Sequence, residues 1–433
     1  MPFVGIGVGI GRQRFGGGIF AAYAARVAAD GGVTEAGACV DAVSGISLDA
    51  SLLLVPSGYK EDVVYSQIPT DGSGDLTFTR ASTATRVNSE GLIESVATGV
   101  PRLDYSQGSC PSLLLEGQRT NLLTYSEEFD NGSWTKGTGG VSTVNVTANY
   151  AISPDGYQNA ERIQLTRDSA GFAQVAQTVS TTSGQVYTFS VYLKSLNGTP
   201  TIMFGSYGGT NAQTATLTNE WVRYTWTATS PSTSAFPMLM IWGGIASTSL
   251  SADFLAYGYQ LEQGAYATSY IKTTSATVTR LADDCSKTGI SSLIGQTEGT
   301  MFIDFEYFAT LPITTYFSID NVAGNNRIII YGVSTPTIYC LVQVNGVTQA
   351  TFQFNPNSNT RYKMAIAYKV NDFAFYLNGS QTGVDLSGSV TWTTPLSRFT
   401  FNTASNYNGN RIYQAALFTT RLSNAELAEL TTL

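Results

Sequence analysis

Short stretches in which apolar and polar residues alternate recur along most of this chain, and they restrict it to a mainly β fold. Residues 184–195 show the pattern clearly, because Tyr187, Phe189, Val191 and Leu193 fall on one face of a predicted strand. Residues 221–230 and 236–244 follow the same pattern, and turn dipeptides separate such stretches. Many short strands at regular spacing predict β-sandwiches.

The chain divides into four predicted regions. An extended N-terminal anchoring arm (1–24) and an adaptor (25–119) precede two tandem β-sandwiches, a jelly roll over 120–285 and a second sandwich over 297–433. The arm is predicted to be extended because apolar residues alternate with glycine in it, and the adaptor contains too few apolar residues for a large core of its own. Near the end of the chain, Ser423 and Glu426 form a predicted helix-capping box.

Composition excludes several classes of function. Only 12% of residues are charged, the net charge is -8 and there is no basic run, so we expect no binding to nucleic acid. The sequence contains no run of about twenty apolar residues, so it predicts no membrane-spanning helix. Histidine is absent, which removes Ser-His and Cys-His triads and His-ligated zinc sites. We therefore expect neither an enzyme nor a cofactor. The N-terminus also lacks the pattern of a secretory signal peptide.

The four cysteines are far apart in the sequence and form no CxxC motif. A secreted disulfide framework would be denser, so we expect Cys39, Cys110, Cys285 and Cys340 to be buried free thiols.

The first sandwich contains a candidate ligand platform. Exposed aromatic faces next to amides suit sugar binding, and Trp242 with Tyr207 and Asn211 could supply them. Trp242 could instead belong to the core, and the sequence leaves both readings open. Trp226 shares a strand face with apolar neighbours, so we assign it to the core.

The second sandwich contains polar loop residues that either bind a ligand or only form turns; among them we select Asn326, Arg327 and Tyr407. Asp320 and Asn321 could join a calcium site, but no DxDxD cluster accompanies them, so we predict no metal. Asp304 and Glu306 lie two residues apart and share a strand face. Their neighbours on that face are apolar, which favours a partly buried polar pair or an edge strand over the paired carboxylates of a glycosidase.

Several segments resemble phage proteins. Residues 71–94 (DGSGDLTFTRASTATRVNSEGLIE) and 113–136 (LLLEGQRTNLLTYSEEFDNGSWTK) resemble an adaptor of phage head-spike and tail-fibre proteins, and residues 257–283 resemble the strand that closes the following jelly roll. Such jelly rolls are similar to carbohydrate-binding modules. Residues 363–379 and 416–430 resemble a concanavalin A/laminin-G-type sandwich. Together these similarities cover roughly residues 60–433.

The resemblance implies a protein of the virion surface, made in the bacterial cytoplasm, that binds host or environmental glycans. We expect a head fibre, with a tail fibre (a receptor-binding protein) or a purely structural decoration protein as alternatives. We also expect a homo-oligomer, most simply a trimer. The arm would anchor it to another virion protein through Phe3, Val4, Ile6, Val8 and Ile10, followed by a positive collar of Arg12 and Arg14.

Overall fold

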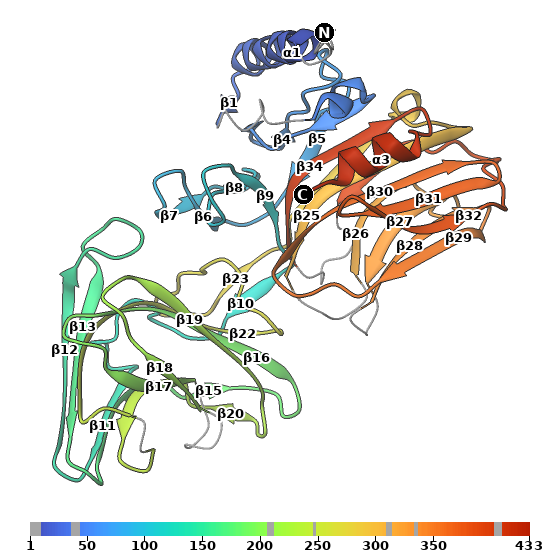
Figure 1. The fold of residues 1–433 in the computed structure, drawn as a ribbon. Helices are drawn as coiled ribbons and strands as arrows, with labels where there is room; N and C mark the ends of the chain where they lie inside the picture. Colours follow the sequence, from blue (N-terminus) through green and yellow to red (C-terminus); the bar gives the residue numbers. More distant parts are fainter. Residues whose placement is uncertain are drawn as a thin grey trace, which may run out of the picture. The chain divides into compact units, whose positions relative to one another are not determined.

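The computed structural model is mainly β, as the sequence predicts (Figure 1). It describes residues 10–35, 44–205, 212–245, 248–308, 314–332, 337–401 and 409–433. The chain forms two compact units. An inserted unit comprises Leu92–Ser95 and Arg119–Arg280, and an outer unit comprises Met1–Gly91, Val96–Gln118 and Leu281–Leu433. Within the described ranges, no helix is long and apolar enough to cross a bilayer.

The inserted unit contains two five-stranded sheets. The β14 sheet has the order β11 (Thr135–Gly139), β14 (Phe172–Ala176), β21 (Met238–Trp242), β17 (Thr201–Gly205) and β18 (Ala212–Thr216). The β22 sheet has the order β12 (Ser142–Ala151), β13 (Ala160–Arg167), β22 (Ser251–Gln263), β16 (Val186–Ser195) and β19 (Val222–Thr229). Shorter strands are β7 (Ile93–Val96), β10 (Arg119–Asn121), β15 (Val179–Ser180), β20 (Ser234–Ala235) and β23 (Val278–Arg280).

These two sheets form a β-sandwich with one core. Side chains of both sheets meet in it, for example Val175 and Leu239 from the β14 sheet with Phe189 and Phe254 from the β22 sheet. The face of β16 predicted from alternation is the buried one. The two ends of the segment Arg119–Arg280 lie side by side, because β10 pairs antiparallel with β23 and Arg119 lies opposite Arg280.

The outer unit contains a ten-stranded and an eight-stranded sheet. The β28 sheet has the order β1 (Val33–Thr34), β3 (Gly58–Lys60), β4 (Val63–Val64), β5 (Leu76–Thr79), β24 (Asp284–Thr288), β33 (Arg398–Phe401), β26 (Thr314–Asp320), β27 (Arg327–Gly332), β28 (Ile338–Val344) and β29 (Val347–Phe354). The β25 sheet has the order β32 (Ser380–Asp385), β31 (Asp372–Leu377), β30 (Thr360–Lys369), β25 (Glu298–Tyr307), β34 (Asn410–Phe418), β9 (Ser112–Leu115) and β8 (Leu103–Asp104), and β2 (Leu52–Leu54) also pairs with β34. The remaining elements are α1 (Ile10–Ala29), η1 (Gly45–Asp49), β6 (Ala84–Val87), η2 (Ser291–Leu293) and α3 (Asn424–Thr431).

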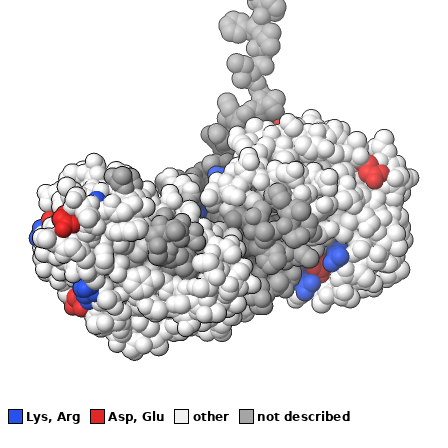
Figure 2. Space-filling model, turned by 90° about the horizontal axis from the view of Figure 1, so that it is seen from below, with Lys and Arg blue, Asp and Glu red and all other residues white. Residues whose placement is uncertain are grey.

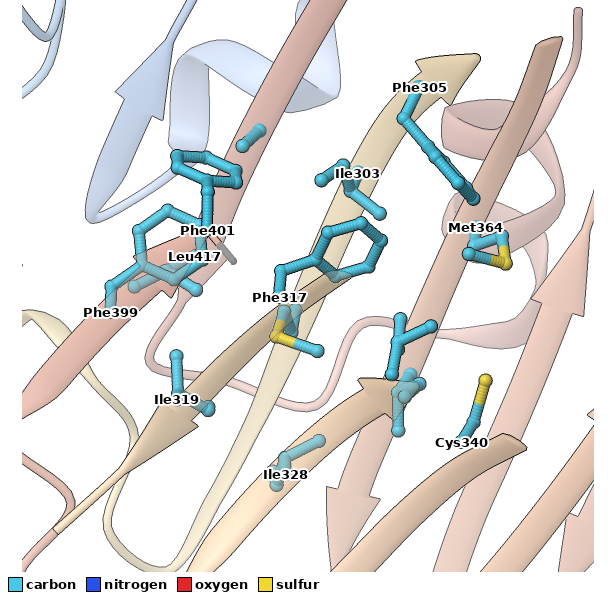
Figure 3. Packing of buried hydrophobic residues seen from close by; sticks show 14 of the residues in the cluster. Ile303, Phe305, Phe317, Ile319, Ile328, Cys340, Met364, Phe399, Phe401 and Leu417 are labelled. Atoms are coloured by element: carbon cyan, nitrogen blue, oxygen red, sulfur yellow. The ribbon is translucent and has the colours of Figure 1, made fainter. Parts of the chain in front are cut away.

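The core of the outer unit lies between its two sheets. Figure 3 shows Ile303 and Phe305 of β25 pointing toward Phe317 of β26, and the two phenylalanine rings meet edge to face at 5.2 Å. The opposite face of the β25 sheet is also partly covered, because α3 buries Leu427 and Leu430 there. The predicted capping box of α3 is confirmed: the Ser423 side chain accepts from the Glu426 N–H, and the Glu426 side chain accepts from the Ser423 N–H.

The predicted adaptor is not a separate region. Strands from residues 33–115 add to both sheets of the second sandwich, and their apolar residues, such as Leu54, Phe78 and Leu115, belong to its core. The inserted unit ends at Arg280 and not at residue 285, because β24 pairs with β5 and β33 of the outer unit. The adaptor has no large core of its own, as its composition predicts, because its strands share a core with residues 281–433.

The predicted extended conformation of residues 1–24 is wrong over residues 10–24, which lie in α1. The glycine–apolar alternation stops near residue 11, and the Ala-rich segment that follows favours a helix, since alanine has the highest helix propensity. Of the proposed anchor residues, Ile10, Arg12 and Arg14 lie in this helix. Phe3, Val4, Ile6 and Val8 lie outside the described residues.

The C-terminal half of α1 docks onto the outer unit through Arg26. Its guanidinium donates to both carboxylate oxygens of Asp75 and to the Ser66 carbonyl (2.6 Å), and it lies 5.5 Å from the centre of the Tyr65 ring. Replacing Arg26 with methionine keeps a long apolar stem but leaves Asp75 without this partner. We expect amide hydrogen exchange in residues 19–29 to become roughly tenfold faster or more, as for the loss of a partly buried charged hydrogen bond.

Lys60→Met is the matched control, because Lys60 pairs with Asp30 at the surface, where such pairs contribute little. Equal exchange in the two variants would show that Arg26 does not hold the helix.

Local turn and cysteine predictions had mixed outcomes. Asn345 and Gly346 both have positive φ (52° and 81°), as is typical of an Asn-Gly hairpin turn, and they join β28 to β29. Cys285 and Cys340 are buried free thiols as predicted. Cys110 is disulfide-bonded, contrary to the prediction, because distance along the sequence does not report distance in the fold. Cys39 lies outside the described residues.

Candidate functional site

The outward face of the β14 sheet carries large apolar side chains. Alternation along β21 sends Leu239 and Ile241 into the sandwich core, so Met238, Met240 and Trp242 point to the other side. The same alternation in β14 sends Phe172, Gln174 and Ala176 outward. These outward apolar residues form their own cluster, separate from the core: Ala176, Met203, Met238, Met240, Phe172, Phe236, Trp242 and Ile245. We call this cluster the aromatic platform.

The strand register aligns the platform in rows. Phe172 lies directly opposite Trp242, and Gln174 lies opposite Met240, which in turn lies opposite Met203 of β17. Met203 is only 1% exposed although it points away from the core, while Phe172 and Trp242 are half-buried. Methionines therefore form a floor with two partly exposed aromatic rings beside it.

Glycines let the platform side chains lie flat against the backbone. A Cβ on Gly139, the residue opposite Phe172, would come within 2.4 Å of the Phe172 ring. A Cβ on Gly244 would come equally close to the Trp242 indole, at 2.4 Å. Any larger residue at either position would displace a ring.

A hydroxyl fixes the strand end that carries Trp242. Thr248 is buried, and its Oγ1 accepts from the Trp242 N–H at 3.1 Å and donates to the Trp242 carbonyl at 2.7 Å. The backbone of Trp242 is thereby held in place before any ligand arrives, which lowers the entropy cost of binding.

The platform face is electrically neutral. Of the outward-pointing side chains on these five strands, none that the structure describes is charged. Charged side chains are also sparse on the molecular face shown in Figure 2. Gln174 and Thr214 add polar groups to the platform face, and neither side chain hydrogen-bonds to another described residue. The face thus combines aromatic rings with uncommitted neutral donors and acceptors.

The tryptophans of the first sandwich separate as follows. Trp242 lies on the outward face and not in the sandwich core, so its role in a ligand platform stays a prediction. Trp226 packs against the core, so that prediction is confirmed. Trp221 packs elsewhere, beside Tyr257 and Tyr270. The predicted partners of Trp242, Tyr207 and Asn211, lie outside the described residues.

The predicted loop residues of the second sandwich have structural roles. Asn326 is fully buried: its side chain donates to the Thr394 carbonyl at 2.9 Å and accepts from the Asn345 N–H, so it holds two backbone groups together. Arg327 donates from Nε to Gln343 at 2.9 Å on the neighbouring strand. Tyr407 lies outside the described residues. Buried amides such as Asn326 stabilise turns by satisfying backbone groups, a role that sequence does not distinguish from ligand binding.

The carboxylates considered from the sequence are all engaged by arginines. Arg361 binds both oxygens of Asp304 at 2.7 Å. Arg411 and Tyr413 donate to Glu306 at 3.2 and 3.1 Å. These contacts confirm that Asp304 and Glu306 form a partly buried polar pair. Catalysis by a glycosidase would instead need one carboxyl group that is available as an acid and another as a base or nucleophile.

The calcium alternative finds no support in the geometry. Arg398 binds both oxygens of Asp320, at 2.9 and 3.0 Å. Within the described ranges, no group of three or more cysteine or acidic side chains could hold a metal ion.

Comparisons with known proteins give only distant likenesses. No family model matches the chain, and no curated protein does. Solved structures that resemble part of it include the CBM40 module of a Ruminococcus gnavus sialidase bound to α2,3-sialyllactose (13% identity, 33% of this chain, 86% of that chain, TM-score 0.28). Others are a botulinum neurotoxin type C structure from a study of ganglioside-dependent entry (15%, 34%, 39%, TM-score 0.29) and a leech intramolecular trans-sialidase (17%, 32%, 24%, TM-score 0.27). These values are too low to assign a family or a ligand.

Proposed function

We propose that the inserted unit is a non-catalytic glycan-binding module and that the aromatic platform is its binding face. The observation that carries this proposal is the pairing of Phe172 with Trp242 on the neutral outward face of the sheet. Aromatic rings stack on the C–H faces of sugars, and neighbouring amides and hydroxyls satisfy the sugar hydroxyls. Gln174 and Thr214 supply such groups. The lack of charge among the described outward side chains favours a neutral sugar.

The Trp242→Ala variant tests the proposal. Removing a stacking ring is expected to weaken binding roughly tenfold or more, about 1–2 kcal/mol, on an array of bacterial surface glycans and in titrations of its best ligand. Phe172→Ala should behave alike. Trp221→Ala is the matched control, since this tryptophan packs outside the platform.

Unchanged affinity in Trp242→Ala would rule out the platform as the site. Failure of the full chain to bind any glycan on the array would rule out the function.

The same face also suits a protein partner, because Phe172 and Trp242 keep part of their apolar surface exposed beside the buried methionines of the platform. This supports the second candidate, a decoration protein that uses the platform for assembly. Light scattering separates the two: a Trp242→Ala chain that loses its oligomeric state but retains glycan binding would favour assembly.

We place the module on a phage particle, most simply as a head fibre. This part of the proposal rests on the resemblance of residues 71–94, 113–136 and 257–283 to phage adaptor and jelly-roll segments. Weak single-site sugar contacts would gain strength from many copies per particle. Antibody-gold labelling of intact particles tests it: gold on the capsid supports a head fibre, gold at the tail supports a tail fibre, and unlabelled particles contradict both.

A further inference from the structure

The inserted unit has an open groove of about 580 Å³ at one end of the β14 sheet. Thr135, which begins β11, and Gln177, which follows β14, both line it. Its volume falls within the range of small-molecule sites. The nine residues that line the groove include no charged side chain.

Free hydroxyls surround this groove. Five of its residues carry hydroxyls that make no hydrogen bond to another described side chain or backbone group: Ser133, Thr135, Thr178, Ser180 and Thr277. Five such hydroxyls among the lining residues offer both donors and acceptors without charge. They match a polyhydroxylated neutral molecule.

One wall of the groove is held in place. The Gln177 amide accepts from the Thr124 N–H at 3.0 Å and donates to the Thr124 carbonyl at 3.1 Å, so it closes a ring of two hydrogen bonds with one residue. Leu122 and Val179 add apolar surface and also pack against the sandwich core. The groove therefore has a fixed wall and a rim of free polar groups.

The groove and the aromatic platform lie along the same strands. Thr135 pairs with Ala176 at the groove end, while Gly139 pairs with Phe172 at the platform end. Four residues of strand separate these positions, about 13 Å. The intervening outward residues of β11 and β14 are Gly137 and Gln174, and the Gln174 amide lies close over the glycine. Gln174 is therefore the polar side chain that lies on these two strands between the groove end and Phe172.

We infer that the groove is a second subsite for the same ligand, so that the module recognises an extended stretch of a neutral polysaccharide and not one terminal sugar. This inference rests on the proposed glycan-binding function of the platform. One part of the polysaccharide stacks on Phe172 and Trp242, and another part places its hydroxyls among those of the groove. Affinity then depends on ligand length, because only a long ligand reaches both.

Titration of the full chain with ladders of malto-, cello-, xylo- and manno-oligosaccharides, from disaccharide to hexasaccharide, tests this. We expect roughly tenfold or greater tightening along the ladder that binds. The double variant Thr135→Val/Thr277→Val removes two groove hydroxyls with little change of shape. It should abolish the tightening while the disaccharide binds as before. Thr225→Val/Thr229→Val on β19 is the matched control and should retain the full length dependence.

The outcomes separate the two proposals. The second subsite is overturned if affinity does not change with ligand length, or if it rises as steeply in the groove variant as in the wild-type chain. Either result leaves the proposal for the platform unaffected. Weaker binding of every ladder length in Trp242→Ala, together with length dependence that is lost only in the groove variant, supports both. No binding to any ladder counts against the glycan function itself, and the subsite falls with it.

Discussion

Replacing Asp283 with asparagine is expected to lower the free energy of unfolding of the outer unit by about 3–5 kcal/mol. Asp283 is fully buried and accepts hydrogen bonds from Arg80 (3.1 Å), from Arg102 and from the backbone N–H of Glu116 (2.8 Å). Asparagine has nearly the same shape but no charge, so two buried guanidinium groups lose their shared counter-ion. Urea unfolding of the full chain measures the change.

Lys369→Gln is the control for this experiment. Lys369 pairs with Glu298 at 3.3 Å, but its side chain is 53% exposed, so we expect a loss of about 1 kcal/mol or less. A loss below about 1 kcal/mol in Asp283→Asn as well would mean that the buried charges reorganise or that water reaches them.

The Asp283 cluster explains why the adaptor belongs to the second sandwich. Burial opposes the charge of Arg102, but Asp283 and Glu116 together raise its pKa above the ordinary value. Arg80, Glu116 and Asp283 come from three segments that are far apart in the sequence, at residues 71–94, 113–136 and 257–283. Those segments therefore meet in one buried ionic cluster, which ties together parts of the chain that are up to 203 residues apart.

Features set by neighbouring residues could be predicted from the sequence. The positive φ angles of Asn378 and Gly379 follow from the residue types, since asparagine and glycine tolerate the left-handed region, and the buried face of β16 follows from alternation. Trp226 was assigned correctly because its strand has a regular pattern of apolar neighbours. Strand pairing between distant segments has no such local signal, so the addition of β2 and β9 to β34 was not predicted.

The candidate site shows the same limit. The sequence points to Trp242 as a candidate. Every residue from 238 to 242 is apolar, however, so the two-residue alternation of a strand does not show which face of this strand lies toward the core. Phe172 and Gln174 were missed altogether. Their role depends on pairing with β21 and on glycines at positions 137 and 139, and only the fold brings these together. A strand with two glycines at alternate positions, as in residues 135–139, is the signal that could have pointed to them.

The second large effect that we expect is a fall in the stability of the inserted unit as pH rises. Glu161 of β13 is 2% exposed, and burial, together with nearby Asp130, raises its pKa to about 8. One carboxylate oxygen accepts from the Asp130 N–H at 2.8 Å. In the unfolded chain the same group has an ordinary pKa of about 4.3. The folded inserted unit therefore holds a proton on Glu161 over a pH range in which the unfolded chain releases it.

The direction of this pH effect follows from which state binds the proton. Below pH 4 both states are protonated, so the contribution of Glu161 to stability is complete. As pH rises from about 4.3 to about 8, only the folded state keeps the proton, and this contribution is lost. We expect the loss to reach about 2–4 kcal/mol by pH 8.5, since each unit of pKa difference is worth about 1.4 kcal/mol at most. Glu161→Gln keeps the shape of the protonated acid and does not titrate.

Comparison of the variant with the wild-type chain isolates this one group from the other buried carboxyls of the unit. Urea unfolding monitored by tryptophan fluorescence, which includes the buried Trp134, should show equal stability at pH 4 and a variant more stable by about 2–4 kcal/mol at pH 8.5. Glu220→Gln, at an exposed position of the same unit, should show no such pH-dependent gain. A Glu161→Gln chain that is less stable than wild type at pH 8.5 would show that the carboxyl is ionised and that its charge stabilises the fold.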